Sequence, residues 1–229
     1  MRRNNRKTTS FASKTFRLAT GVFAIATVTA GCGSEAGTAT AQTPEPSAAT
    51  KQVNNAPWGL DPENSRVSFV SIKANEIAET HRFTQLKGSV SPDGKASLSI
   101  PLDSVETNVD IRNERMREVF FETANFPDAK VTTDLDLATF EALAPGERTS
   151  TETTLRLDLH GVRADLDAEL FVTRLSPTKV SVETAAPVIV EAASFNLLGG
   201  VDKLMELAAL PAISPLAPVT VSLVFEQAQ

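Results

Sequence analysis

The 229-residue chain contains no tyrosine, one cysteine, one tryptophan and two histidines. A lone cysteine has no disulfide partner within the chain, and zinc sites need cysteine or histidine pairs at fixed spacing. Neither HxxxH nor HExxH occurs, and the GxSxG and P-loop motifs are also missing. These absences exclude the common zinc, α/β-hydrolase and nucleotide-binding chemistries.

The remaining polar residues do not point to catalysis either. His160 precedes a glycine on a polar face, which is typical of a turn, and His81 lies in an acidic loop without an obvious partner. Asp134 and Asp136 are two residues apart on an expected strand, so both carboxylates lie on its solvated face. We therefore expect no catalytic residue, no metal and no cofactor.

Acidic residues are missing ahead of Glu35, where basic residues precede a short apolar run over residues 18–30. This order is typical of a secretory signal, because a bilayer span needs about 20 apolar residues. Small residues then precede Cys32, as in a bacterial lipobox, although Thr29 stands where leucine or valine is usual. We expect residues 1–31 to be a lipoprotein signal peptide and Cys32 to be lipidated. Cleavage by ordinary signal peptidase at a small-x-small site is the alternative.

Residues 32–56 are poor in large apolar groups, so after the lipidated cysteine they are typical of a flexible tether. Gly33 resembles the residue found in lipoproteins sorted to the outer membrane. We therefore expect a lipoprotein of the cell envelope that faces the periplasm and is held at the outer membrane. Six of the 22 Lys and Arg precede residue 32, leaving 16 against 28 Asp and Glu and a net charge of −12. We expect no nucleic-acid partner, and membrane attachment only through the acyl chains on Cys32.

The remaining residues, 57–229, form one domain in which apolar residues recur at every second position. Leu155, Leu157 and Leu159 alternate with polar neighbours, for example, so this strand has one apolar and one polar face. Turn signals such as His160-Gly161 separate the runs. We expect about eight strands, at residues 65–73, 83–90, 95–102, 130–137, 153–160, 163–173, 178–190 and 218–226.

Two segments break the alternation. Residues 111–119 are helical in composition, and residues 201–210 have apolar residues at helical spacing, so the second segment should plug an end of the sheet or lie across an opening. Eight amphipathic strands with short links form either a closed barrel or a sandwich. A barrel of that size can hold one small ligand, whereas a sandwich would fill its core.

The run DSVETNVDIRNERMREVFFETANFPDAKV, residues 103–131, is the most specific part of the sequence. It resembles the signature of the YceI-like family, small secreted β-barrels that hold a polyisoprenoid lipid. The resemblance extends over residues 57–226 and implies an all-β fold: an extended eight-stranded antiparallel barrel, lipocalin-like, with short helices. The residues that carry it are Trp58, Asp61, Ser65, Val67, Phe69, Thr107, Arg112, Phe120-Phe121, Phe126-Pro127, Leu155, Leu157, Gly161 and Ser194-Phe195.

The resemblance also implies a function. An isoprenoid, such as a quinone or a polyprenol, would thread the apolar interior for carriage or storage, where each buried CH₂ contributes about 0.8 kcal/mol. Phe120, Phe121 and Phe126 would form the rim or gate, and Thr107 and Arg112 would cap the turn and helix locally. The expected lining is Val67, Phe69, Leu98, Ile100, Val131, Leu135, Leu155, Leu157, Leu166, Leu170, Val221, Leu223 and Phe225, although an inward leucine is more often ordinary core.

Two other functions stay open at this point. A tethered envelope module could scaffold a partner through its surface, which predicts a filled core without a cavity. An enzyme acting on a lipid-like substrate would need a polar constellation at the tunnel mouth. A homodimer is compatible with any of the three.

Overall fold

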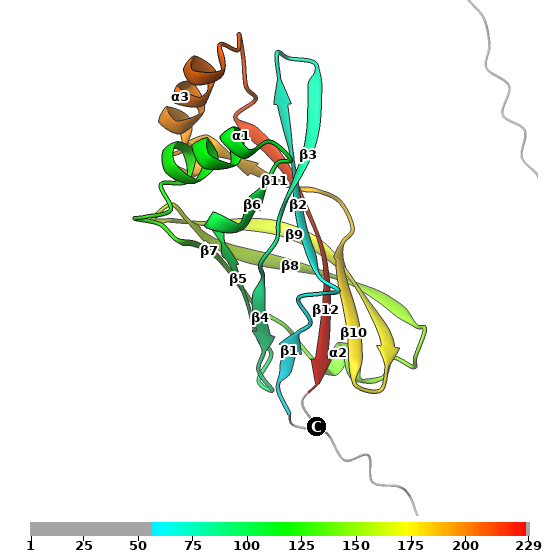
Figure 1. The fold of residues 1–229 in the computed structure, drawn as a ribbon. Helices are drawn as coiled ribbons and strands as arrows, with labels where there is room; N and C mark the ends of the chain where they lie inside the picture. Colours follow the sequence, from blue (N-terminus) through cyan, green and yellow to red (C-terminus); the bar gives the residue numbers. More distant parts are fainter. Residues whose placement is uncertain (1–55, 228–229) are drawn as a thin grey trace, which may run out of the picture. The chain divides into compact units, whose positions relative to one another are not determined.

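The computed structural model describes residues 56–227. The expected signal peptide (1–31), Cys32 and the tether up to residue 55 lie outside the described residues. Figure 1 shows an antiparallel β-barrel whose helices α1 and α3 gather at one end. In the described part, no helix has the length and apolar character needed to cross a membrane.

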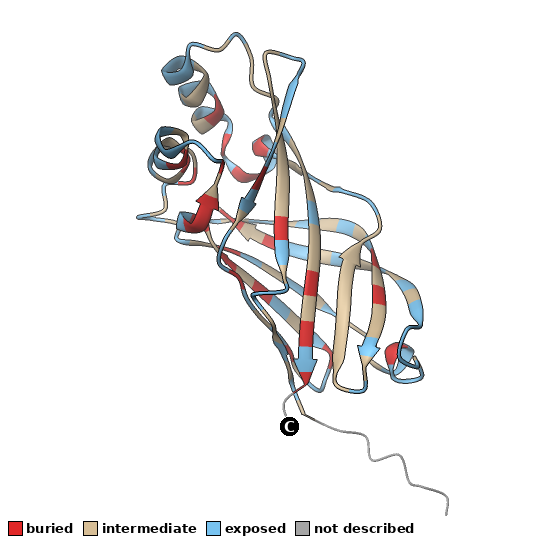
Figure 2. Cartoon of the chain, turned by 45° about the vertical axis from the view of Figure 1, so that its right-hand side comes forward, coloured by how far each residue is buried: buried red, intermediate tan, exposed pale blue. Residues whose placement is uncertain are grey.

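In residues 56–227, twelve strands form one antiparallel sheet. Buried and exposed residues alternate along many of them (Figure 2), as the spacing of apolar residues predicts. The strands are β1 (Trp58–Leu60), β2 (Arg66–Lys73), β3 (Ile77–Phe83), β4 (Lys87–Val90), β5 (Lys95–Pro101), β6 (Val105–Glu106), β7 (Asp128–Asp134), β8 (Arg148–Leu159), β9 (Val162–Ser176), β10 (Lys179–Thr184), β11 (Val188–Glu191) and β12 (Leu216–Gln227).

Eight of these strands close into a ring. Their order is β1-β4-β5-β7-β8-β9-β10-β12, and β12 returns to β1 through the pairs Trp58↔Gln227 and Leu60↔Phe225. Farther along β12, β2 and β11 take over from β1 and β10 as its neighbours, and β3 and β6 extend the wall beside β2. The closed eight-stranded antiparallel barrel is therefore confirmed, and the sandwich is excluded.

The turn between β8 and β9 is the predicted hairpin. His160 and Gly161 have φ values of 51° and 75°, and β8 and β9 pair up to Leu159↔Val162, which gives a two-residue loop. Positive φ at both central residues matches the right-handed twist of the strands. A β-carbon on Gly161 would lie 3.0 Å from the Phe126 ring, so glycine also lets that ring cover the turn.

The helices lie close to the predicted positions. The segment expected at 111–119 is α1 (Asp110–Arg115), which continues as the π-helical turn η2 (Met116–Phe120). The segment expected at 201–210 is α3 (Leu198–Ala208), which includes Gly200. A β-carbon on Gly200 would lie 3.0 Å from the Phe120 side chain and 3.2 Å from its Cα, so glycine allows α3 to approach η2 closely. Three short helical turns complete the domain: η1 (Leu102–Ser104), α2 (Ala138–Glu141) and η3 (Ala192–Phe195).

Candidate functional site

The barrel contains a cavity of about 530 Å³. This volume is within the range of about 300–1,000 Å³ that is typical of small-molecule sites. Inward side chains from every strand of the ring except β1 line it, and most of them are Val, Leu, Ile, Phe or Ala. Met116, Val201 and Leu204 add a lining from η2 and α3, so α3 covers part of the cavity at the helical end.

Fifteen of the sixteen residues that were expected to face a ligand line this cavity. They come from six strands, from Leu135 just after β7 and from the segment around η2, although many residues separate them in sequence. Alternation on regular strands is what brings them together, because each strand turns the same face inward. The fifteen are Val67, Phe69, Leu98, Ile100, Phe120, Phe121, Val131, Leu135, Leu155, Leu157, Leu166, Leu170, Val221, Leu223 and Phe225.

Phe126 does not line the cavity, contrary to expectation. Its ring centroid lies 4.2 Å from that of His160, and its edge covers Gly161. Glu122 has a positive φ of 49° and accepts a hydrogen bond from the Phe126 backbone N–H, so the chain turns sharply just after η2. Because of this turn, Phe126 covers the β8–β9 hairpin.

Phe120 and Phe121 both line the cavity although they are adjacent. Neighbouring residues on a strand would point to opposite faces, but these two lie at the end of a π-helical turn. Their rings meet edge to face with centroids 4.8 Å apart. Phe121 also approaches Phe83 at 6.0 Å, and Phe83 approaches Phe69 at 5.5 Å, so aromatic rings connect η2 to β3 and β2.

Four polar side chains gather at the helical end of the cavity, and they were not predicted from the sequence. Lys73, Glu79, His81 and Arg112 all line the cavity, and we call them the mouth cluster. The missing element was β3, because residues 74–82 were taken as a loop. In β3, Glu79, His81 and Phe83 are less exposed than Ala78, Thr80 and Arg82, so the strand does alternate. Because its inward residues are largely polar, the strand has no alternation of apolar and polar residues, which is the pattern used to predict the other strands.

Ion pairs hold the mouth cluster together. Oε2 of Glu79 lies 2.6 Å from Nζ of Lys73 and 2.9 Å from Nη1 of Arg112. The hydrogen bond from Lys73, supported by Arg112, lowers the pKa of Glu79 despite the opposing effect of desolvation. All three side chains are about a quarter to a third exposed, which places them between the barrel interior and solvent.

Arg112 and Thr107 connect this cluster to α1. Arg112 Nη2 donates to the Thr107 carbonyl at 2.7 Å, and the Thr107 hydroxyl donates to Asn113 Oδ1 at 2.6 Å. The local role expected for Thr107 agrees with this geometry. Arg112 does more than was expected, because its Nη1 also reaches β3 at Glu79.

His81 is the most buried member of the cluster, with 4% of its surface exposed. Its Nε2 lies 2.8 Å from the Ser71 hydroxyl, and its ring centroid lies 5.2 Å from that of Phe69. Burial lowers the pKa of His81, and the positive charges of Arg112 and Lys73 act in the same direction, whereas Glu79 opposes them. The imidazole is therefore neutral at pH 7.

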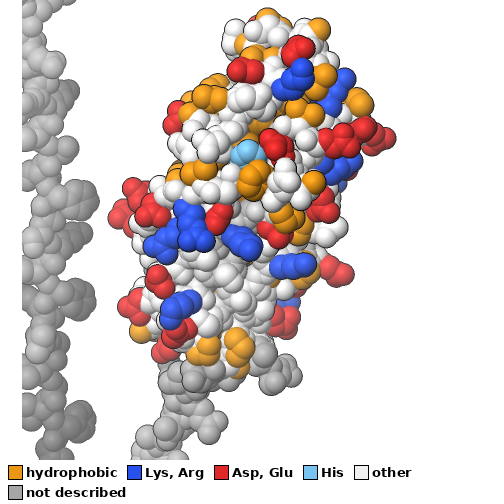
Figure 3. Space-filling model, turned by 90° about the vertical axis from the view of Figure 1, so that its left-hand side faces the viewer, with side chains coloured by type: hydrophobic (Ala, Val, Ile, Leu, Met, Phe, Trp, Pro, Cys, Tyr) orange, Lys and Arg blue, Asp and Glu red, His pale blue; other side chains and the backbone are white. Residues whose placement is uncertain are grey.

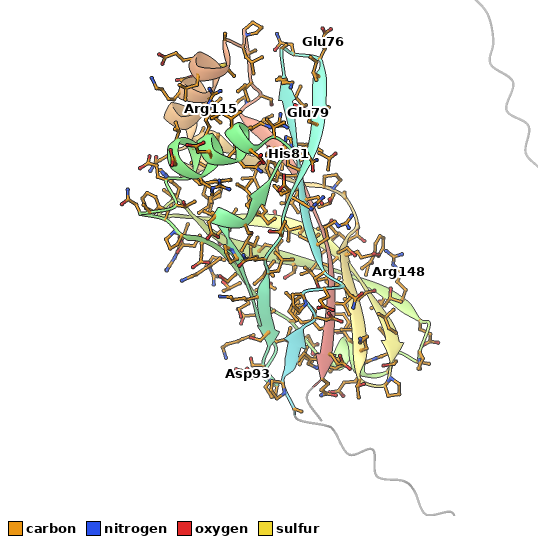
Figure 4. All side chains as sticks on the ribbon, in the orientation of Figure 1. Glu76, Glu79, His81, Asp93, Arg115 and Arg148 are labelled. Atoms are coloured by element: carbon orange, nitrogen blue, oxygen red, sulfur yellow. The ribbon has the colours of Figure 1, made fainter. Side chains whose placement is uncertain are left out.

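Figure 4 shows Glu79 and His81 on β3, at the same end of the domain as Arg115 and the helices α1 and α3. Within the described residues, no three His, Cys, Asp or Glu side chains gather to form a metal site. The arrangement provides an apolar chamber with a small group of charged and polar side chains at one end. Such a site suits a molecule with a long apolar part and a polar end.

Comparison with known proteins identifies the family. Residues 58–225 match the model of the YceI-like domain. A polyisoprenoid-binding domain from Saccharophagus degradans implicated in plant cell wall breakdown is 42% identical, with a TM-score of 0.73 and coverage of 75% of this chain and 98% of that one. BcnA from Burkholderia cenocepacia, 17% identical, shares the fold with a TM-score of 0.55 and coverage of 72% and 98%. No curated protein matches. The chain belongs to the YceI-like domain family.

Proposed function

We propose that this protein binds an isoprenoid or another long-chain lipid inside its barrel and carries or stores it in the cell envelope. The observation that carries the proposal is the apolar cavity of about 530 Å³. A hydrocarbon chain that enters it leaves water, which contributes about 0.8 kcal/mol per CH₂. The 42% identity to a polyisoprenoid-binding domain supports an isoprenoid as the lipid class.

The cavity argues against a scaffold module with a filled core. Buried residues such as Val67, Leu98 and Leu223 pack in the core and also line the open space, so the barrel wall is well formed around it. Protein interiors are close-packed, and empty space of this size inside one is uncommon without a ligand to occupy it.

The mouth cluster does not favour an enzyme. Ser71 and His81 lie at hydrogen-bond distance, as a nucleophile and its base would. In such a dyad an acid normally orients the second imidazole nitrogen, but Nδ1 of His81 has no hydrogen-bond partner among the described residues. We therefore propose binding without chemistry.

Exposed apolar side chains around the helical end support exchange of the lipid with a membrane. Figure 3 shows hydrophobic side chains exposed over this end, among charged ones. In the described part of the chain, seven of the eight large apolar residues that stay exposed lie on elements of this end, and Leu175 is the other. The seven are Ile77, Val109, Ile111, Ile189, Leu198, Leu207 and Leu216.

The location in the envelope rests on the sequence. A signal peptide ending before Cys32 would export the chain, and acyl groups on Cys32 would hold it at a membrane facing the periplasm. Gly33 favours the outer membrane in this proposal. Labelling with radioactive palmitate in a bacterial host, compared with Cys32→Ala, tests the lipid anchor separately from the barrel.

Mass spectrometry of an organic-solvent extract tests the central proposal. The purified protein should release a stoichiometric isoprenoid or other long-chain lipid. Leu157→Arg places a charge on the cavity wall and should abolish retention, whereas Thr154→Arg adds the same charge to an exposed position of β8 and should retain the lipid. A folded Leu157→Arg variant that keeps its lipid, or an extract without lipid from several hosts, would contradict the proposal.

A further inference from the structure

We infer that the mouth cluster, together with Arg115, is a binding site for an anionic oxygen headgroup, a phosphate or a carboxylate, on the lipid. This inference depends on the proposed function and specifies which end of the ligand lies at the helical end of the cavity. The chain as a whole has a net negative charge, but the charged side chains around the cavity have a net positive charge.

The cavity lining has an excess of positive charge. Its charged side chains are Lys73, Arg112 and Arg115 against Glu79 alone. From residue 56 onward the chain has 15 Lys and Arg against 26 Asp and Glu, so this local excess runs against the composition of the domain. Basic residues gathered at the mouth of an apolar chamber attract an anion, because low-dielectric walls focus their field.

The ion pairs within the cluster leave part of that charge uncompensated. Glu79 is shared between Lys73 and Arg112, so one carboxylate faces two cations. Arg115 follows Arg112 by three positions on α1, which places both on neighbouring parts of the helix surface. No ion pair or hydrogen bond engages the Arg115 guanidinium within residues 56–227. Three cations and one anion leave two positive charges for a ligand.

Two buried nitrogen atoms at this site also have no partner. Nε of Arg112 and Nδ1 of His81 make no hydrogen bond to the described residues. Glu79 and Thr107 fix the other two nitrogens of Arg112, and Ser71 fixes Nε2 of His81. Buried polar groups are nearly always hydrogen-bonded, so unpaired ones at a cavity wall indicate the place of a ligand group.

An oxyanion matches this set better than a neutral head does. A carboxylate or phosphate oxygen accepts hydrogen bonds from several donors and supplies the negative charge that the site is missing. The oxygen of a quinone carbonyl or an alcohol also accepts hydrogen bonds, but it carries no charge and leaves both positive charges uncompensated. The apolar walls then hold the chain of the lipid, and the mouth cluster determines its orientation.

Paired lipids that differ only in their head test this inference. Binding of farnesyl phosphate and farnesol, and of palmitate and hexadecanol, would be measured with the delipidated protein. We expect each anion to bind at least about tenfold more tightly than its alcohol, since charge-assisted hydrogen bonds of this kind are worth at least that factor. The phosphate pair and the carboxylate pair distinguish the two headgroup types.

Arg115→Gln is the informative variant, because Arg115 has no ion pair whose loss would disturb folding. It should remove most of the difference between anion and alcohol and leave alcohol binding unchanged. Lys203→Gln removes the same charge from α3 at the same end but outside the cavity lining, and it should preserve the difference. NMR titration should show the pKa of His81 rising when farnesyl phosphate is bound, and no such rise with farnesol.

Equal affinities for anion and alcohol would overturn the inference while leaving lipid binding intact. A difference that survives in Arg115→Gln, or a quinone of equal chain length that binds as tightly as the phosphate, would overturn it too. If none of these lipids binds, the proposed function itself fails, and the headgroup site fails with it.

Discussion

Nη1 of Arg112 lies 2.9 Å from Oε2 of Glu79, although 33 residues separate them in the sequence. This contact joins α1 to β3, two elements that both border the helical end of the cavity. Arg112 therefore does more than cap the turn next to it, because it also links helix α1 to the barrel wall.

Glu79→Gln should weaken this link. The amide loses the charge that both Lys73 and Arg112 contact, and we expect a fall of about 0.5–1 kcal/mol in the free energy of unfolding, because partly exposed ion pairs contribute little more. Urea unfolding measures the change. Glu183→Gln loses the exposed ion pair to Arg148 at 3.4 Å, while the glutamine oxygen can still accept the hydrogen bond from Ser222. It should change stability less, and an equal loss in both variants would contradict the role given to Glu79.

The buried His81 predicts a loss of stability in weak acid. Burial, then Arg112 and Lys73, lower its pKa in the folded state, whereas Glu79 opposes them. Below about pH 6.5 the unfolded state therefore binds more protons at this residue, and the free energy of unfolding falls as the pH drops toward the folded-state pKa. Above about pH 6.5 the stabilising contribution is fully present.

Denaturant unfolding between pH 5 and 7 checks this expectation. His81→Gln removes the titrating group, so its stability should depend less steeply on pH over that interval than that of the unchanged protein. Parallel curves for the two proteins would show that His81 does not titrate differently on folding.

Gly94→Ala should be strongly destabilising. Gly94 has a φ of 84°, and a β-carbon there would clash with the backbone carbonyl oxygen of Leu135. Gly146 has a similar φ of 91°, but nothing lies within 4 Å of its β-carbon position. Gly146→Ala should therefore cost only the backbone strain of about 1 kcal/mol, and Gly94→Ala clearly more. Thermal unfolding compares them, and equal shifts would mean that backbone strain alone determines the cost.

Phe121 and Phe126 should respond differently to truncation. Phe121→Leu enlarges the cavity and should change the amount or chain length of retained lipid, because Phe121 lines the cavity and contacts Phe120 and Phe83. Phe126→Leu should lower the melting temperature through lost packing on His160 and leave the lipid unchanged. Lipid extraction and thermal unfolding of both variants separate these effects, and altered lipid content in Phe126→Leu would contradict the assignment.

The barrel could be predicted from the sequence because its strands repeat a simple local rule. Leu155, Leu157 and Leu166 line the cavity, as an alternating apolar pattern requires. Strand β1 was missed because three residues, Trp58–Leu60, are too few to show any period. Strand β1 nevertheless closes the ring by pairing with β12. Because β12 lies at the far end of the chain, no local pattern could predict this pairing.

The mouth cluster could not be predicted in the same way. His81 and Glu79 are polar inward residues, so they break the hydropathy pattern on which the strand predictions depended. Their role in the site depends on contacts with residues of other elements, above all Arg112. Local spacing in the sequence does not predict a contact between residues that are 33 positions apart. Phe126 was expected at the rim, but a sharp turn at Glu122 places it outside the cavity. Because this turn contains no glycine, the sequence gives no sign of it.

Ala56 and Gln227 lie side by side at the opposite end of the barrel from α1 and α3 (Figure 1), where the Gln227 amide donates to the Ala56 carbonyl and Trp58 pairs with Gln227. Anything joined to either end of the domain is thus attached at its base. A support, a fusion partner or a label held there leaves the opening unobstructed, so the domain can be fixed to a surface and still be loaded and emptied from its free side.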